Sequence, residues 1–316
     1  MGEMTAVRDA YGAALKELGE QDLRIVGLEA DVASSTKSGI FGNAFPERYF
    51  NVGISELNMV SMAAGLARTG FIPFVNTFAV FLTTRGADPI QSLIAYDKLN
   101  VKLCGPYCGL SDSYDGASHQ AITDLAFVRA IPNMTVITVA DAVETKKAVF
   151  AIAEHQGPVY LRLSRAAAPV FYPEDMKFEI GRGITVREGG DVTIITTGTV
   201  LHKALAAAEL LEAKGIQARV VDMHTIKPID EELIIECARE TGAIVTVEEH
   251  SVCGGLGSAV AEVLAEHMPV PMTRIGATDF AESGDYEQLL VKYGYGPESI
   301  AEKCEKVMKR KQVQKK

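Results

Sequence analysis

Residues 49–66 read YFNVGISELNMVSMAAGL, a stretch rich in small and apolar residues in which a helix should begin. Glu56 lies at the point where this helix should begin. A carboxylate in apolar surroundings must be paired, hydrogen-bonded or neutralised, because burying an isolated charge is costly. The sequence therefore predicts a functional role for Glu56. The alternative is a carboxylate at a helix start that only interacts with the helix dipole.

Strands and helices alternate on both sides of this stretch. In the first unit we expect helices near 5–19, 55–69, 79–95, 122–130 and 142–155, and strands at 23–28, 71–75, 100–104, 135–139 and 158–163. In the second unit we expect strands at 191–196, 217–222, 243–248 and 271–276, helices at 201–214, 230–241 and 256–267, and two further helices. This alternation is typical of mostly parallel sheets that are covered by helices on both faces.

Residues 166–190 interrupt the alternation with two prolines, several glycines and charges, as connections between domains do. We therefore expect an α/β protein with two doubly wound domains and mostly parallel sheets. The predicted organisation is a first domain at 1–168, a linker at 169–190 and a second domain at 191–316.

Composition narrows the class of protein further. The 316 residues are enough for two domains with their own cores. The formal net charge of −10 argues against non-specific binding of nucleic acid, whose phosphates would be repelled. No apolar run reaches the roughly 18 residues of a membrane span, and the N-terminus lacks the layout of a signal peptide.

The odd number of five cysteines indicates reduced thiols and a cytoplasmic location. Cys104 and Cys108 are close in sequence, but no further Cys/His pair completes a zinc site. We expect both to be buried small hydrophobic residues. The basic cluster KRKQVQKK at 309–316 is interpreted as a solvated tail.

Four loops of the first unit are candidates for a binding site, because ligands of open α/β sheets bind at the carboxyl ends of the strands. These loops are rich in polar and small residues, as a binding site requires. They are Asp31–Thr36, Asn76–Phe81, Gly105–His119 and Ser164–Arg165.

Several motifs, taken in order, resemble the transketolases. In the first unit they are FNVGISELNMVSMAAGLA, PFVNTFAVFL, SDSYDGASHQAITDLAFVRAIPNMTVI and YLRLSR. In the second unit, DVTIITTGTV, VVDMHTIKPID and EEHSVCGGLGSAVAE resemble the transketolase C-terminal domain. The resemblance covers essentially the whole chain. It implies a pyrimidine-binding domain followed by a C-terminal domain.

The resemblance also implies a cofactor and a partner. Transketolases use thiamine diphosphate and Mg²⁺, which they hold through a GDG motif on another, N-terminal domain. No GDG stands in this sequence, so it resembles the C-terminal half of a split transketolase. We then expect an N-terminal partner subunit to supply the diphosphate and Mg²⁺ contacts, with no metal ligands on this chain, in an α2β2 heterotetramer. Sugar phosphates are the implied substrates, of the pentose phosphate pathway or of branched-pentose catabolism.

Matching motif positions imply roles for individual residues. Glu56 corresponds to the family glutamate that hydrogen-bonds a ring nitrogen of the cofactor's aminopyrimidine. The family's cofactor-packing aromatic residues correspond to Phe78 and Phe81, and Asp31 is counted with the cofactor-binding residues. Asp115 corresponds to the residue that binds a hydroxyl of the donor ketose. The expected contacts to the sugar phosphate are His119, Arg165, Arg8 and Ser35.

Each role has a plainer alternative. The two phenylalanines would be ordinary core, Arg8 a solvated helix residue, Ser35 a turn residue and His119 a hydrogen-bonded loop histidine. Three positions depart from the family: Thr84 replaces an aromatic residue, Tyr107 a substrate-facing histidine and Ala117 a proline. The specificity for the sugar is therefore left open.

Other patterns have less specific interpretations. Arg85 and Asp88 stand at helical spacing and are compatible with an ion pair. GGLGSAV at 254–260 lacks the third glycine of a dinucleotide motif, so a tight turn into the following helix is expected. His250 is expected to be structural, with an interface role as an alternative.

Three rival functions share this layout. Two are enzymes, the beta subunit of a 2-oxo acid dehydrogenase and a relative of deoxyxylulose-phosphate synthase. The third is a regulatory or scaffold module that has kept the fold and lost the chemistry. The presence of Glu56, Asp115, His119 and Arg165 together argues against such a loss.

Overall fold

The first domain is built on one mostly parallel sheet. The computed structural model describes the backbone of residues 2–314 and the side chains of residues 2–311. Over this range the strand order is β12-β6-β7-β5-β4-β2-β3, and only the β12–β6 pair is antiparallel. The strands of this domain are β2 (Ile25–Glu29), β3 (Tyr49–Asn51), β4 (Ile72–Asn76), β5 (Lys102–Gly105), β6 (Thr135–Thr138) and β7 (Val159–Arg162).

Helices cover both faces of this sheet, which confirms the predicted fold class. One face packs against α4 (Glu56–Arg68), α5 (Ala79–Arg85) and α7 (Asp124–Ala130). The other packs against α1 (Val7–Gln21), α3 (Gly39–Ala44) and α8 (Ala142–Glu154). Consecutive strand residues enter opposite layers, as the pleat requires. In β4, Phe74 joins the layer of α1 and α8, and Val75 joins the layer of α4 and α5.

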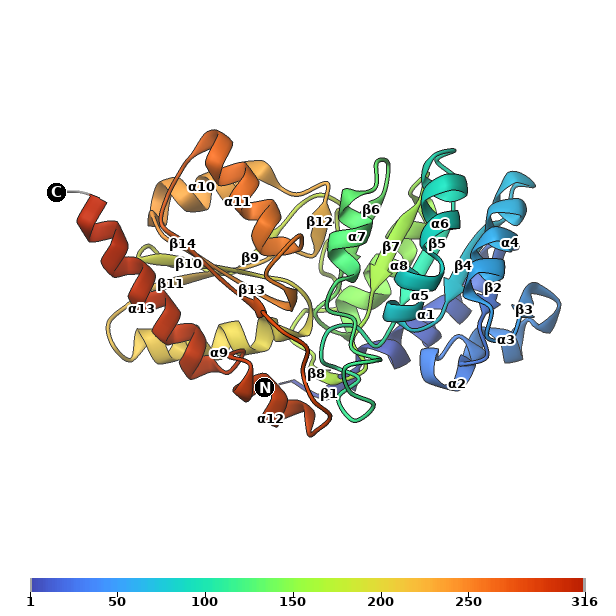
Figure 1. Ribbon diagram of the computed structural model, residues 1–316, viewed down its shortest axis with the longest axis horizontal. Helices are drawn as coiled ribbons and strands as arrows, with labels where there is room; N and C mark the ends of the chain where they lie inside the picture. The colour runs from blue at the N-terminus through green and yellow to red at the C-terminus, as the bar shows by residue number, and fades with distance from the viewer. Residues whose placement is uncertain (1, 315–316) are drawn as a thin grey trace.

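The second domain repeats this architecture beside the first (Figure 1). Its strand order is β14-β13-β10-β11-β9, with β9 antiparallel. The strands are β9 (Ile184–Arg187), β10 (Val192–Thr196), β11 (Ala218–Asp222), β13 (Ile244–Ser251) and β14 (Met272–Ala277). Helices α9 (Leu201–Glu212), α12 (Tyr286–Lys292) and α13 (Pro297–Gln314) cover one face, and α10 (Glu231–Thr241) and α11 (Leu256–His267) the other.

The helix expected at 79–95 is wrong as a single element. The structure divides it into α5, the short turn α6 (Ala87–Pro89) and a π-helical turn η2 (Ile90–Ala95). Pro89 has no amide hydrogen for the helical ladder, and α5 already ends at the residue before Gly86. The break ends α5 at Arg85.

Short elements that depend on a distant partner were not expected from the sequence. The first is β1 (Met4–Ala6), which pairs antiparallel with β8 (Ala167–Pro169). Strand β9 lies within the segment predicted as a linker and adds an antiparallel edge to the second sheet. The remaining short helical elements are α2 (Ala33–Thr36), η1 (Pro46–Arg48) and η3 (Gly198–Val200).

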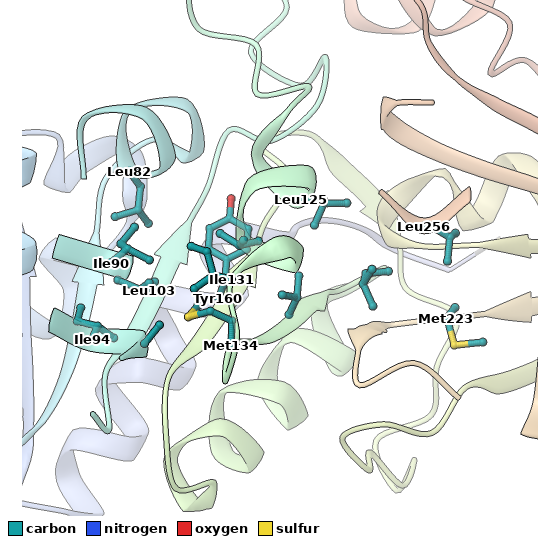
Figure 2. Packing of buried hydrophobic residues seen from close by; sticks show 14 of the residues in the cluster. Leu82, Ile90, Ile94, Leu103, Leu125, Ile131, Met134, Tyr160, Met223 and Leu256 are labelled. Carbon is teal, nitrogen blue, oxygen red and sulfur yellow. The ribbon is translucent and has the colours of Figure 1, made fainter. Parts of the chain in front are cut away.

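The two domains share a strand and a core. Strand β12 (Thr225–Lys227) follows β11 of the second domain but pairs with β6 of the first. One cluster of buried residues runs from Leu82 and Ile94 in the first domain to Met223 and Leu256 in the second (Figure 2). The domains therefore pack through continuous apolar contact and not through polar surfaces alone.

A buried charged group also joins the domains. Arg162 of β7 forms an ion pair with Asp124 at 2.6 Å, and both side chains are essentially inaccessible. Its guanidinium also donates to the carbonyl oxygens of Ala121 and of Glu249, the latter in the second domain. His250 lies nearby, where its Nε2 accepts the Ala126 amide. Burial lowers the pKa of His250 to about 4, so this interface histidine is neutral and structural.

The glycine-rich segment at 254–260 forms the expected tight turn. A Cβ on Gly255 would lie 2.0 Å from a carboxylate oxygen of Glu248. That carboxylate accepts the amides of Leu256 and Gly257 at the start of α11. An internal acid therefore occupies the helix start where a dinucleotide motif would bind phosphate.

Glu29, at the end of β2, organises the loop that follows it. One carboxylate oxygen accepts the amides of Ala30 and Val32, and the other accepts the hydroxyls of Thr36 and Ser38. The Glu29 side chain is fully buried. These bonds fix the backbone of residues 30–38, which includes Ser35.

The C-terminal basic cluster is partly docked. Arg310 donates to the carbonyl oxygen of Met272 at 2.8 Å, and Lys311 to that of Thr241 at 2.5 Å. The interpretation of 309–316 as a solvated tail is therefore wrong for these two residues, and Lys315 and Lys316 lie outside the described residues. None of the helices described between residues 2 and 314 combines the length and apolarity needed to cross a bilayer.

We predict that Asp124→Asn destabilises the protein by about 3–5 kcal/mol, because it leaves the buried Arg162 guanidinium without its counter-charge. The matched control is Glu262→Gln, which removes the carboxylate of a more exposed ion pair with Arg129. It should cost at most about 1 kcal/mol. Urea denaturation of both variants measures the two values. Equal losses would show that burial does not set the strength of the Arg162 contact.

We predict that Glu29→Ala loosens the loop after β2, because four buried donors lose their common acceptor. Amides of Val32–Ser38 should exchange hydrogen faster than in the parent, and stability should fall by about 1.5–3 kcal/mol. Exchange measured by mass spectrometry checks this, with the exposed Glu154→Ala as control. Unchanged protection of this loop would contradict the assigned role of Glu29.

Candidate functional site

The four predicted site loops meet at one edge of the first sheet. They follow β2, β4, β5 and β7, and these strands are consecutive in the order β7-β5-β4-β2. All three pairings among them are parallel, so their carboxyl ends point the same way. Helix α4 begins at this edge because the edge strand β3 is also parallel to β2.

Glu56 is the first residue of α4, and its side chain is 5% exposed. One of its carboxylate oxygens accepts a hydrogen bond from Arg85 Nη1 at 2.8 Å. Arg85 thus pairs with Glu56, and no ion pair with Asp88, with which its spacing was compatible, is found among the described residues. Glu56 Oε2 accepts no hydrogen bond from the residues that the structure describes.

An aromatic cluster adjoins this acid. The guanidinium carbon of Arg85 lies 3.9 Å from the centre of the Phe81 ring. Phe81 and Phe78 have nearly parallel rings, with centres 5.9 Å apart. Phe78 stacks on Tyr107 at 4.1 Å, and the ring of His119 meets the Phe81 ring edge-on at 5.2 Å. The cluster brings loops after β4 and β5 into direct contact.

Two arginines lie near the ring of Tyr107. The guanidinium carbons of Arg8 and Arg165 lie 5.2 and 5.5 Å from the centre of its ring. Arg8 Nη1 also donates to the Tyr107 hydroxyl at 2.5 Å and to the backbone oxygen of Ser35 at 3.0 Å. Arg8, Ser35 and Arg165 are thus brought to the same site from three separate segments. The structure engages Ser35 through its carbonyl group.

Asp112 and Asp115 lie beside these arginines. Asp112 is 1% exposed, and neither of its buried carboxylate oxygens has a hydrogen-bond partner among the described residues. Burial and the charge of Asp115 raise the pKa of Asp112 to about 7, and the charges of Arg165 and Arg8 oppose this rise. Asp115 itself is exposed. The site therefore combines two cations with an acidic pair.

The second domain holds the loop that carries Tyr107, Asp112 and His119. Gly116 has a positive φ of 76°, and a Cβ there would lie 2.3 Å from the Ser283 hydroxyl, so the position requires glycine. The Leu110 amide donates to the Glu249 carboxylate at 3.2 Å. The Gly284 amide donates to the carbonyl oxygen of Ser113 at 2.9 Å. Residues of both domains therefore set the geometry of the site.

Three further positions named from the sequence are exposed. Asp31 hydrogen-bonds Asn51. Thr84 is exposed and donates to the Val80 carbonyl. Ala117 is also exposed. The substituted position that does enter the cluster is Tyr107, whose positive φ of 66° turns the ring toward Phe78.

Sequence reasoning missed three contributors to the site: Arg85, Asp112 and Glu29. Asp112 lies within a loop that the strand-end rule selects, but its burial beside two arginines depends on how that loop folds. Glu29 was visible as an acid at a strand end. Its hydrogen bonds to Thr36 and Ser38 became evident only when the loop was seen to turn back over it.

Comparisons with known proteins agree with this geometry. Residues 3–170 match the family model described as "Transketolase, pyrimidine binding domain", and residues 181–300 match "Transketolase, C-terminal domain". A putative transketolase C-terminal section from Methanocaldococcus jannaschii is 45% identical over 313 residues, which are 98% of this chain and 98% of that protein. The transketolase of Rattus norvegicus is 40% identical over 306 residues.

The similarity extends to solved structures. One described as "Split gene transketolase, inactive beta4 tetramer" superposes with a TM-score of 0.90 at 50% identity, covering 96% of this chain and 98% of that one. The chain spans about half of the rat enzyme, 49% of its length. These relatives favour transketolase over the two rival enzymes. The chain therefore belongs to the transketolase family and contains its pyrimidine-binding and C-terminal domains.

Proposed function

We propose that this chain is the C-terminal subunit of a two-chain transketolase that uses thiamine diphosphate. The reaction is the family's general one, transfer of a two-carbon ketol unit, here from a ketose phosphate to an aldose phosphate. The observation that carries the proposal is the continuous arrangement of Glu56, the aromatic cluster and the two arginines at one sheet edge. This arrangement supports a role for the acid toward the cofactor and for the cations toward the sugar's anionic group.

The residues present fit the aminopyrimidine half of the cofactor. Glu56 offers the free oxygen Oε2 in a sheltered position, and Phe81 offers the face of a half-buried ring beside it. An aminopyrimidine is a flat heterocycle with ring nitrogens, so it matches one carboxyl group and one aromatic face. Thiamine diphosphate, when bound, supplies the carbon nucleophile that ketol transfer requires.

Glu56 and its neighbours then have distinct tasks. Glu56 holds at Oε2 the proton that it shares with a ring nitrogen, and the low polarity around it strengthens that hydrogen bond. Arg85 holds the other oxygen and so orients the carboxyl group. Phe78 and Phe81 pack against the heterocycle and exclude water from it.

The opposite end of the site binds the sugar. Arg8 and Arg165 present guanidinium groups suited to a phosphate; Ser35 adjoins Arg8, and His119 adjoins Phe81. We assign all four to the sugar phosphate. Asp115, which is exposed at the rim, accepts a hydrogen bond from a sugar hydroxyl.

The diphosphate and Mg²⁺ are assigned to an N-terminal partner subunit. Among residues 2–314, no three metal-binding side chains gather at one place, and the rat enzyme has about as much chain again beyond the part that matches. Exposed apolar residues flank Glu56, including Ile54 and Leu57. A groove beside them is lined by Phe50, Met62, Gly65, Leu66 and Thr69. We propose that the partner packs here.

The proposed assembly is an α2β2 heterotetramer. The similar split-gene structure is described as an inactive tetramer of beta chains, which supports self-association of this subunit and its inactivity alone. All five cysteines are unpaired thiols, which agrees with the reducing cytoplasm as its location. Metabolism of pentose phosphates is the corresponding biological role.

We predict that Glu56→Gln lowers turnover of the assembled enzyme by about 10²–10⁴-fold, because glutamine cannot exchange a proton with the cofactor ring. Assembly with the partner should be unchanged, since the amide preserves the shape of the side chain. Steady-state kinetics and light scattering measure the two properties. The exposed Glu209→Gln serves as control. A Glu56→Gln enzyme with near-normal turnover would contradict the mechanism.

We predict that the purified chain, supplied with thiamine diphosphate and Mg²⁺, shows no ketol transfer from xylulose 5-phosphate to ribose 5-phosphate. Addition of a chain that carries the GDG motif should restore activity and produce a four-chain complex, detected by light scattering. Full activity without that partner would refute the two-chain proposal. Turnover of a 2-oxo acid by the complex, in place of the sugar phosphates, would favour the dehydrogenase rival.

A further inference from the structure

Three charged side chains around Tyr107 leave buried polar atoms without partners. They are Nε of Arg8, Nε of Arg165 and both carboxylate oxygens of Asp112. The three residues come from α1, the loop after β7 and the loop after β5. Buried polar atoms are almost always hydrogen-bonded in folded proteins. Such a group of unpartnered donors and acceptors therefore marks a place prepared for a polar ligand.

This group of side chains carries more positive than negative charge. Arg8 and Arg165 contribute two positive charges, and Asp112 is the negative charge buried with them. The groups that face Asp112 are Asp115 from its own loop, Arg165 from the loop after β7 and Arg8 from α1. Neither arginine forms an ion pair with Asp112 within 4 Å among the described residues. Each guanidinium therefore keeps its Nε–H as an unused donor for an anion.

We propose that Asp112 is the internal counter-charge of the anion subsite formed by Arg8 and Arg165, so that a doubly charged anionic group binds together with one proton. The proton passes from solvent to a carboxylate oxygen of Asp112, and no other bond changes. This inference rests on the proposed role of the two arginines in binding the sugar's anionic group. It makes Asp112 a specificity-determining residue.

Asp112 takes up a proton because a bound dianion cancels the stabilisation that the arginines give to its ionised form. In the free site the arginines stabilise the ionised form of Asp112. A bound dianion neutralises these arginines and also repels the carboxylate, so the neutral acid becomes favoured. The buried surroundings strengthen this effect, because water does not screen the charges.

The consequence is a defined dependence on pH. The pKa of Asp112 in the free site is about 7, so the group is mostly ionised above that pH and a dianion must bring a proton with it. Affinity should then fall by up to about tenfold per pH unit from pH 7.5 to 9. Below pH 7 Asp112 already carries its proton. A phosphate monoester loses its second proton near pH 6, so the ligand's own titration lies outside this window.

Titration calorimetry of the full chain tests this with two probes, inorganic sulfate and xylulose 5-phosphate. Sulfate is a dianion across the whole range, so any proton taken up belongs to the protein. Measurement at pH 8 in two buffers of different ionisation enthalpy counts the protons. We expect close to one proton taken up per anion, and a Kd that rises with pH as described.

Asp112→Asn is the matched variant, since it keeps the shape of the side chain and removes its titration. It should bind both anions with no proton uptake and with an affinity that does not change from pH 7.5 to 9. The exposed Asp175→Asn should behave as the parent. In the assembled enzyme, Asp112→Asn should flatten the pH dependence of KM for the phosphorylated donor, which a purely structural role would not do.

If Asp112→Asn does not fold, the measurements on the parent protein are sufficient to test the proposal. Anion binding by the parent without proton uptake, or with an affinity independent of pH, overturns it. Proton uptake that persists in Asp112→Asn overturns it as well. If the chain binds neither anion, the proposed subsite does not exist, and the proposed contact to the sugar's anionic group fails with it. Proton-linked binding together with an assembled enzyme that lacks ketol transfer would support the inference and contradict the proposed reaction.

Discussion

The site depends on the buried guanidinium of Arg162. This group lies at the end of β7, where it pairs with Asp124 and donates to backbone oxygens of Ala121 and of Glu249 in the second domain. The loop that bears Tyr107, Asp112 and His119 ends at Gln120, directly before one of these acceptors. A single charged group thus ties that loop to both domains. It is held in place because leaving any of its partners unpaired in the interior would be costly.

Four buried or sheltered acids near the carboxyl edge of the first sheet differ in how many of their bonding positions have partners. Asp124 has its full counter-charge, and Glu29 has four hydrogen-bond donors. Glu56 has one partner and one free oxygen, and Asp112 has no direct partner. The first two build the framework, since satisfied groups are stable and rigid. The last two retain unused bonding capacity, and these are the acids to which we assign roles toward ligands.

The arrangement of the site also explains why two domains are needed. The loop after β5 is long and rich in small residues, so it does not define its own conformation. Contacts with Glu249, Ser283 and Gly284 of the second domain supply that definition. The shared strand β12 and the continuous apolar cluster join the two domains. The chemistry assigned to the first domain therefore relies on the packing of the second.

The long, strongly patterned elements were predictable from the sequence. Helices α4, α8 and α11 and the buried parallel strands begin and end within a few residues of their expected positions. Their apolar residues recur with the period of the element they form. The single helix expected at 79–95 fails because Pro89 acts on the backbone more strongly than the apolar pattern does. Strands β1, β8, β9 and β12 were not foreseen because each is only three or four residues long and is defined by a distant partner.

The sequence by itself determined the fold class, the four loops at the strand ends and the expectation that Glu56 is sheltered and paired, since these follow from local periodicity and from the cost of burying a charge. The tertiary structure decided which groups meet. It joined Arg85 to Glu56, placed Tyr107 between two arginines and buried Asp112 beside them, while it left Asp31 at the surface with Asn51. These pairings depend on the order of strands in the sheet and on contacts with the second domain, and no local pattern of residues encodes either.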